Sequence, residues 1–313
     1  MSTMHKGLRH GAFHASVTAI LGMAAFGQSV PADTASGNQP TPVTLFFLAD
    51  DSHGNPIREL TKADISLLDN KKPPQSVVEL RTAKDLPLRL GLLIDTSNSQ
   101  GSNELYRPAV KAAFDFLNQI LGDQDTKVFI VDFSSTPKAT SFMNQDQFSK
   151  AKVELSTGGG TAFYDAVNLA CKERMQADRT MPARRVLIVL SDGEDNLSHV
   201  SRVETIVAAQ QAGTTIFTIS TNKSNARAST GDKVLERFAA ETGGYSFSEL
   251  GPKDMPKVFA SIRAQIDSMY NLTYIPAEAG QPGHFSPIEL KITSGGKWKV
   301  HAPKGYYVPS GQN

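Results

Sequence analysis

The chain of 313 residues contains a single cysteine, Cys171, so it cannot form an intrachain disulfide. Positive and negative side chains nearly balance, giving a net charge of +1 at pH 7. This balance excludes the basic surface expected of a nucleic-acid-binding protein. Downstream of the N-terminal stretch, no apolar run is long enough to span a bilayer, and no internal repeat is found. We therefore expect neither a nucleic-acid partner nor a transmembrane segment in the mature protein.

The N-terminal stretch has the features of a secretory signal peptide. Lys6 and Arg9 precede a weakly apolar segment over residues 15–26, and Ala25 and Gly27 are small residues suited to a cleavage site. We predict a signal peptide over residues 1–27, with Ala32 as an alternative cleavage point. The alternative interpretation is an unstructured N-terminal extension. No cysteine lies here, which excludes a lipoprotein anchor.

Residues 28–42 are rich in Pro, Ser, Thr and Gly and are predicted to form a linker. The expected location of the protein is therefore exported: periplasmic, associated with the cell envelope, or secreted. A large exported protein without disulfides favours a bacterial source over an animal one.

Residues 86–268 alternate between predicted strands and helices, as in an α/β fold with a mostly parallel sheet and helices on both faces. Apolar runs predict the strands, and apolar residues at helical spacing predict the helices. The expected strands are 91–94, 128–133, 186–190 and 215–220, with an edge strand near 139–143; the expected helices are 105–121, 203–212, 233–241 and 255–266 and one after Thr161.

The two flanks of this segment read as strands joined by turns. Expected strands are 43–48, 65–70 and 77–80 before the α/β segment, and 270–274, 288–292 and 305–308 after it. Because three short strands cannot bury both of their faces, we predict that residues 43–82 and 269–309 together form one small β-sandwich. The alternative is two independent hairpins packed on the α/β domain.

The segment Gly91–Ser99 is the most informative part of the chain. An apolar run ends at Asp95, and hydroxyl groups follow at Ser97 and Ser99. Ligands in open α/β sheets bind at the carboxyl ends of the strands. One carboxylate and two hydroxyls are hard oxygen ligands, suited to Mg²⁺, Mn²⁺ or Ca²⁺ rather than zinc. A strand that simply ends in a Ser/Thr turn is the alternative interpretation.

Two later segments strengthen the metal interpretation. Residues 156–161 form a glycine-rich loop that ends at Thr161, and the apolar run Val186–Leu190 leads to Asp192. Glycines allow a backbone to approach an ion closely. Two aspartates at strand ends, with a hydroxyl-bearing loop between them in sequence, predict one oxygen-lined site.

The pattern Asp95-x-Ser97-x-Ser99, then Thr161, then Asp192 resembles the metal-ion-dependent adhesion site of the von Willebrand factor A (VWA) family. The flanking sequences Gly-Gly-Gly-Thr-Ala-Phe-Tyr-Asp-Ala (158–166) and Leu-Ser-Asp-Gly-Glu-Asp-Asn (190–196) are also similar to that family. The resemblance covers residues 86–268 and implies a doubly wound, Rossmann-like VWA fold. With its strand-rich flanks, the chain resembles exported bacterial VWA proteins.

The resemblance implies a function for each matched residue. Asp95, Ser97, Ser99 and Thr161 are expected to be ligands of a divalent cation, and Asp192 to contact the ion directly or through water. Mg²⁺ is the expected ion, with Mn²⁺ and Ca²⁺ as alternatives.

Three further acidic residues are expected near this site. Asp165 is a candidate for a group behind the ligands, a helix cap or a purely structural residue. Glu194 and Asp195 are expected on the rim, where they would tune partner choice. The implied partner is a protein that presents an Asp or Glu.

We therefore predict an exported, non-enzymatic protein of the binding or adhesion type. A scaffold component of the cell envelope is the alternative, and a metal-dependent hydrolase is the weaker one, because the nearest histidine, His199, is isolated. An aspartic protease would need a second Asp-Thr-Ser/Gly copy, from which Ser191-Asp192-Gly193 departs.

Overall fold

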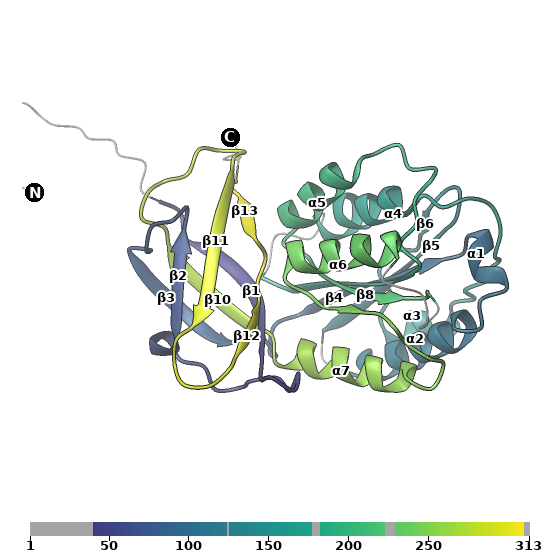
Figure 1. Cartoon of the computed structure of the whole chain (residues 1–313), viewed down its shortest axis with the longest axis horizontal. Helices are drawn as coiled ribbons and strands as arrows, with labels where there is room; N and C mark the ends of the chain where they lie inside the picture. The colour runs from purple at the N-terminus through teal and green to yellow at the C-terminus, as the bar shows by residue number, and fades with distance from the viewer. Residues whose placement is uncertain (1–39, 124, 177–181, 223–228, 310–313) are drawn as a thin grey trace, which may run out of the picture. The chain divides into compact units, whose positions relative to one another are not determined.

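The computed structural model describes residues 40–123, 125–176, 182–222 and 229–309. The predicted signal peptide and most of the predicted linker lie outside these residues. Two sheets formed by the flanks and one α/β sheet make up the described part (Figure 1). No helix among the described residues is both long and apolar enough to cross a membrane.

The α/β domain is built on a sheet of six strands in the order β6-β5-β4-β7-β8-β9. All neighbouring pairs are parallel except β5 and β6. The strands are β4 (Leu88–Asp95), β5 (Thr126–Phe133), β6 (Lys138–Ala139), β7 (Arg184–Ser191), β8 (Thr215–Ser220) and β9 (Ser246–Phe247). Every residue of β4 and β7 is buried, as expected for central parallel strands that are covered on both faces.

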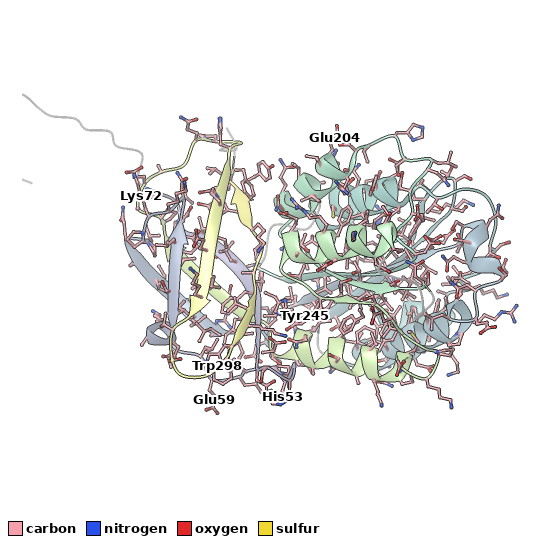
Figure 2. All side chains as sticks on the ribbon, viewed as in Figure 1. His53, Glu59, Lys72, Glu204, Tyr245 and Trp298 are labelled. Atoms are coloured by element: carbon pink, nitrogen blue, oxygen red, sulfur yellow. The ribbon has the colours of Figure 1, made fainter. Side chains whose placement is uncertain are left out.

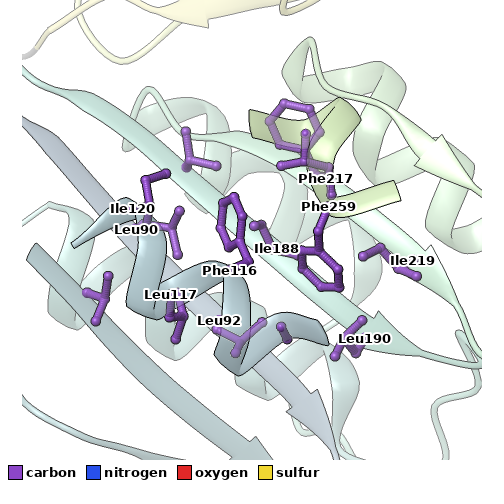
Figure 3. Close-up of a cluster of buried hydrophobic side chains, with 14 of the residues drawn as sticks. Leu90, Leu92, Phe116, Leu117, Ile120, Ile188, Leu190, Phe217, Ile219 and Phe259 are labelled. Carbon is purple, nitrogen blue, oxygen red and sulfur yellow. The ribbon is translucent and has the colours of Figure 1, made fainter. Parts of the chain in front are cut away.

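Helices cover both faces of this sheet. They are α1 (Asn98–Gly101), α2 (Tyr106–Ile120), α3 (Gln145–Lys150), α4 (Phe163–Leu169), α5 (Arg202–Gln211), α6 (Thr230–Thr242) and α7 (Met255–Asp267), together with the π-helix η2 (Ala170–Met175). The 3-10 helix η1 (Lys62–Asp64) belongs to the N-terminal flank. On one face, α2 and α7 bury Phe116 and Phe259 against Leu90 and Ile188 (Figure 3). On the other face, α4, α5 and α6 pack against Leu93 and its neighbours. The predicted VWA-type architecture is therefore confirmed.

Some element boundaries differ from those expected. Helix α6 begins at Thr230 rather than Lys233, because Ser229 and Asp232 cap its N-terminus reciprocally. The helix after Thr161 continues as the π-helix η2. The edge strand expected near 139–143 is limited to Lys138–Ala139, with an isolated bridge from Met143 to Val128.

The flanks form two antiparallel sheets, with strand orders β12-β1-β10-β3 and β13-β11-β2. Their strands are β1 (Val43–Asp50), β2 (Ile65–Asp69), β3 (Ser76–Thr82), β10 (Tyr270–Ile275), β11 (Phe285–Ile292), β12 (Lys299–His301) and β13 (Gly305–Tyr307). Strand β1 pairs with β10 and β12, and β2 pairs with β11. The two flanks therefore form one structure, as predicted, and not two independent hairpins.

Side chains of β1 contribute to the core of the sandwich and also to the core of the α/β domain. Leu45, Phe47 and Ala49 belong to the core of the sandwich, whereas Leu48 belongs to the core under α2 and α7. Successive side chains of a strand lie on opposite faces, so one strand contributes to both cores.

The α/β segment leaves and re-enters the sandwich at neighbouring strands. Thr82, the last residue of β3, lies opposite Tyr270, the first residue of β10. The Ala83 amide donates a 2.6 Å hydrogen bond to the carbonyl of Met269. The two ends of the α/β segment are therefore side by side.

A polar cluster lies where β1 meets the α/β domain. The Tyr245 hydroxyl donates a 2.5 Å hydrogen bond to Asp50, whose exposed fraction is 1%. His301 stacks on the Tyr245 ring at a centroid distance of 3.9 Å, and its Nε2 lies 3.6 Å from Asp50 Oδ1. Burial lowers the pKa of His301, against the opposing effect of the nearby Asp50 carboxylate. Figure 2 shows Tyr245 at this boundary.

Candidate metal centre

The predicted site residues lie at the carboxyl ends of the two central strands. Asp95 is the last residue of β4, and Asp192 directly follows β7, which pairs with β4. The chain crosses from β4 to β5 on one side and places β7 and β8 on the other. Such a switch point leaves a crevice between the two outgoing loops, where ligands of open α/β sheets bind.

Asp95 is fully buried and held at both oxygens. The backbone N–H of Ser97 donates to Oδ1 at 2.9 Å, and the Ser191 hydroxyl donates to Oδ2 at 2.7 Å. Burial raises the pKa of Asp95 to about 6, with a smaller contribution from the charge of Asp192 and opposition from the hydrogen bonds of Ser97 and Ser191. The carboxylate is therefore desolvated and held in one orientation.

Serine hydroxyls connect this first loop to Asp192. The hydroxyls of Ser97 and Ser99 are 3.1 Å apart, and the Ser99 hydroxyl donates a 2.6 Å hydrogen bond to Asp192 Oδ2. Ser97 is buried and Ser99 is exposed, so the connected oxygens run from the interior to the surface. The structure thus brings together four of the five residues predicted as ligands.

Thr161, the fifth, is placed by backbone contacts. The amides of Gly158 and Asn98 donate to the carbonyls of Thr96 and Gly159, at 2.7 and 3.1 Å respectively, which fastens the glycine-rich loop to the loop after β4. The Thr161 amide donates to the Asn196 side chain at 2.9 Å. Thr161 is buried between the loops that follow β4 and β7.

The predicted outer residues make different contacts. Asp165 accepts hydrogen bonds from the backbone amides of His199 and Val200, so it holds the segment that follows the site. Asp195 accepts from the amide of Tyr164 at 3.0 Å and from the Ser198 hydroxyl at 2.5 Å, and so caps the first turn of α4. Glu194 has an exposed side chain, and its amide donates to Asp192 Oδ1 at 3.1 Å.

Two residues of the centre were missed by the sequence analysis. Ser191 holds Asp95, and the buried side chain of Gln100 donates to Asp192 Oδ2 at 3.1 Å and to Ser99 Oγ at 3.2 Å. Each is the immediate neighbour of a predicted ligand. A polar residue at the buried end of an apolar strand was the available signal for Ser191.

Gly193 allows the loop after β7 to pass close to α6. Its φ is +79°, and a Cβ atom there would lie 2.2 Å from the carbonyl oxygen of Gly231. Any other residue would be strained and would collide with the backbone. The Asn222 side chain also donates to the Asp192 carbonyl at 2.9 Å. The hydrogen bond from Asn222 to the Asp192 carbonyl therefore helps to hold the backbone of Asp192 in place.

The donor set fits a hard divalent cation. Asp95 and Asp192 are both buried, and within the described ranges neither carboxylate forms an ion pair with Lys, Arg or His. Buried charges normally have a counter-charge. The described residues contain no cluster of three or more His, Cys, Asp or Glu side chains that could hold a metal. The side-chain oxygens at this edge belong to two carboxylates, Asp95 and Asp192, and to the hydroxyls of Ser97 and Ser99. Such oxygen donors suit Mg²⁺, Mn²⁺ or Ca²⁺.

The family model of the von Willebrand factor type A domain matches residues 90–260 of the chain. The chain belongs to the VWA family. The matched region contains Asp95, Ser97, Ser99, Thr161 and Asp192, but not the strands of the flanks. A comparison with curated proteins found no match.

Several solved structures are similar to this VWA protein in fold. A von Willebrand factor type A protein from Catenulispora acidiphila is 12% identical, with a TM-score of 0.48 over 88% of this chain and 74% of that chain. An aerotolerance-related membrane protein from Bacteroides fragilis is 15% identical, with a TM-score of 0.44 over 57% of this chain and 98% of that one. The PilB minor pilin from Streptococcus sanguinis is 15% identical, with a TM-score of 0.44, and 63% of each chain is covered.

Proposed function

We propose that this chain is an exported, non-enzymatic binding protein whose VWA domain holds a divalent cation and engages a carboxylate of a protein partner. The residues that would hold the ion are Asp95, Ser97, Ser99, Thr161 and Asp192. Mg²⁺ is the proposed ion, with Mn²⁺ and Ca²⁺ as alternatives. Export is proposed from the N-terminal sequence.

The observation that carries the proposal is the hydrogen-bonded series from Asp95 to Asp192. The Ser97 amide binds buried Asp95, and the hydroxyls of Ser97 and Ser99 continue the series to the second carboxylate. Two desolvated carboxylates repel each other, and a cation between them would remove that cost.

The chain's own residues also explain why a partner carboxylate would bind. A bound divalent cation supplies positive charge and water positions that an incoming Asp or Glu can take. Asp95 and Asp192 provide only two formal negative charges, and the remaining proposed side-chain donors are neutral hydroxyls, so the loaded site stays electrophilic. Ser99 is the exposed member of the series, so a partner would approach the site from the side of Ser99.

A binding role is favoured over hydrolysis by the position of His199. Its side chain is 89% exposed, and Nδ1 lies 2.8 Å from Asp165 Oδ2. The His199 ring therefore contacts Asp165, whose carboxylate also binds the His199 backbone amide. A general base must reach the proton that it removes, directly or through one water.

Isothermal titration calorimetry tests the proposal directly. The wild-type protein should bind Mg²⁺, and Asp95→Ala should abolish binding because it removes the most deeply held carboxylate. Ser102→Ala is the matched control, since Ser102 caps the neighbouring helix α1 through its backbone. Unchanged Mg²⁺ binding by a folded Asp95→Ala protein would contradict the site.

A second measurement tests the partner. A glycine-rich peptide with a single Asp should bind in Mg²⁺ and not in EDTA, and the same peptide with Asn in place of Asp should not bind. If the two peptides bind equally, the proposed recognition of a carboxylate is wrong.

A further inference from the structure

A cavity of about 500 Å³ lies beside the candidate metal centre, between helices α1 and α2 and the segment that contains Leu155 and Thr157. Gln100 lines this cavity, and the amide group of the same side chain donates to Asp192 Oδ2 and Ser99 Oγ. The cavity and the metal centre therefore share a residue. A partner bound at the metal centre would therefore lie next to the cavity.

Two residues that line the cavity each have a buried polar atom with no hydrogen-bond partner in the described part of the chain. These atoms are Gln100 Oε1 and the Tyr106 hydroxyl, and the exposed fractions of the two residues are 1% and 8%. Buried polar groups are almost always hydrogen-bonded in folded proteins. Gln100 Oε1 accepts only, so the group that would satisfy it must donate a hydrogen bond.

The rest of the lining combines apolar side chains with polar and charged ones, among them Thr157 and Arg107. Val110, Phe114 and Leu155 are partly buried and pack against the core beneath α2. Arg107 is exposed and forms no ion pair with any residue that the structure describes, whereas Lys111 pairs with Asp115 at 2.6 Å. Among the described residues that line the cavity, the cation without an ion pair is therefore the Arg107 guanidinium, which suits a carboxylate.

We propose that this cavity takes an aromatic side chain with a polar hydrogen, such as tyrosine, from the same partner segment whose carboxylate binds at the metal centre. The ring packs on Val110 and Leu155, its O–H donates to Gln100 Oε1, and a further acidic group of the segment pairs with Arg107. The inference rests on the proposed function and specifies its partner: an acidic segment with an aromatic residue near its metal-bound Asp or Glu.

A peptide library tests this. Fluorescein-labelled glycine–serine peptides carry one fixed Asp and, at each of the three positions before and after it, Tyr, Phe or Ala. Binding to the full chain is measured by fluorescence polarisation in Mg²⁺ and in EDTA. At one position or more, Tyr should bind about tenfold more tightly than Ala, as expected for burying one aromatic side chain.

Val110→Trp fills the cavity and should remove the gain from Tyr, while the Ala peptides and Mg²⁺ bind as before. Val78→Trp is the matched control, because Val78 lies in β3 of the sandwich with 49% of its surface exposed. A Val110→Trp protein that binds Mg²⁺ but keeps the Tyr gain would overturn the proposal.

The outcomes separate the cavity from the metal centre. Peptides that bind in Mg²⁺ with no preference for Tyr at any position overturn the cavity proposal and leave the proposed function standing. Phe peptides that bind as tightly as Tyr peptides overturn the role of Gln100 Oε1. If every peptide binds equally tightly in Mg²⁺ and in EDTA, the proposed function is wrong, and the cavity inference with it.

Discussion

The Ser191 hydroxyl donates a 2.7 Å hydrogen bond to Asp95 Oδ2, so the last residue of one central strand holds the last residue of its neighbour. The register of β4 and β7 sets this contact, since Ile94 lies opposite Leu190. The orientation of Asp95 therefore depends on correct pairing of the two strands. The candidate metal centre is tied in this way to the core of the sheet.

Replacing Ser191 tests the contribution of this contact. Ser191→Ala should weaken Mg²⁺ binding about tenfold without abolishing it, because groups that orient metal ligands typically contribute 10–100-fold to affinity. Isothermal titration calorimetry measures the change. Ser198→Ala, which removes a hydroxyl from the loop after β7 that contacts Asp195, serves as the control and should leave the affinity unchanged. An unaltered affinity in Ser191→Ala would contradict the positioning role.

Asp195 and Glu194 should differ although they are adjacent in sequence. Asp195→Ala removes the cap on the Tyr164 amide and should lower the free energy of unfolding by about 1 kcal/mol. Glu194→Ala removes an exposed side chain and should change it by less than about 0.5 kcal/mol. Urea denaturation monitored by circular dichroism gives both values. Equal effects would show that Asp195 acts as a surface residue and not as a cap.

His301 should make stability depend on pH. Its pKa in the folded protein is below the ordinary value of 6.5, chiefly because it is buried. Between the two values the unfolded chain binds more protons, so the free energy of unfolding should be highest above pH 6.5 and fall as the pH drops through the folded-state pKa. Lys299 opposes protonation of His301, whereas Asp50 favours it.

Chemical denaturation at a series of pH values measures the effect of His301. His301→Phe keeps a ring against Tyr245 but cannot titrate, and the fall in stability between pH 8 and pH 5 should become shallower than in the wild type. His284→Phe, at an exposed position, should retain the wild-type slope. If both variants give the same slope, burial of His301 does not contribute to the pH dependence.

Deleting residues 269–313 should unfold the N-terminal flank. The deletion removes β10 and β12, both neighbours of β1, and exposes Phe47 and Leu67 of the sandwich core. Limited proteolysis should then cleave within residues 43–82. A protease-resistant flank would contradict the paired sandwich.

Residues 84–268 on their own should still fold and bind Mg²⁺, because the α/β sheet is covered on both faces by its own helices. Their melting temperature should be lower than that of the full chain, since Leu48 and Met269 belong to the core under α2 and α7. Differential scanning calorimetry compares the two proteins.

Export should be accompanied by cleavage of the N-terminal segment. The basic start, apolar segment and small residues of the N-terminus predict cleavage, so mass spectrometry of the native protein should find a mature N-terminus near Gln28 or Asp33. Full-length protein recovered from the cytoplasm would contradict export.

Strong local patterns explain what could be predicted from the sequence. The apolar runs before Asp95 and Asp192 define central strands, and parallel strands bring their carboxyl ends to one edge. Contacts between distant segments could not be predicted in this way. Gln100 gives no local sign that its amide will reach Asp192, and Asp195 gives none that it will cap α4. Strand β12 has only three residues, too few for alternation to be visible, and depends on pairing with β1.

The link between α7 and β10 restricts how the last helix of the α/β domain can slide. Helix α7 ends at Asp267 and β10 begins at Tyr270, so two residues separate them. A shift of α7 along its axis acts directly on β10, because only two residues separate them and the Ala83–Met269 hydrogen bond anchors this link. Such a movement would pull β10 out of register with β1 and β3, which hold it on both edges. The position of α7 is therefore coupled to three paired strands of the sandwich, β1, β10 and β3.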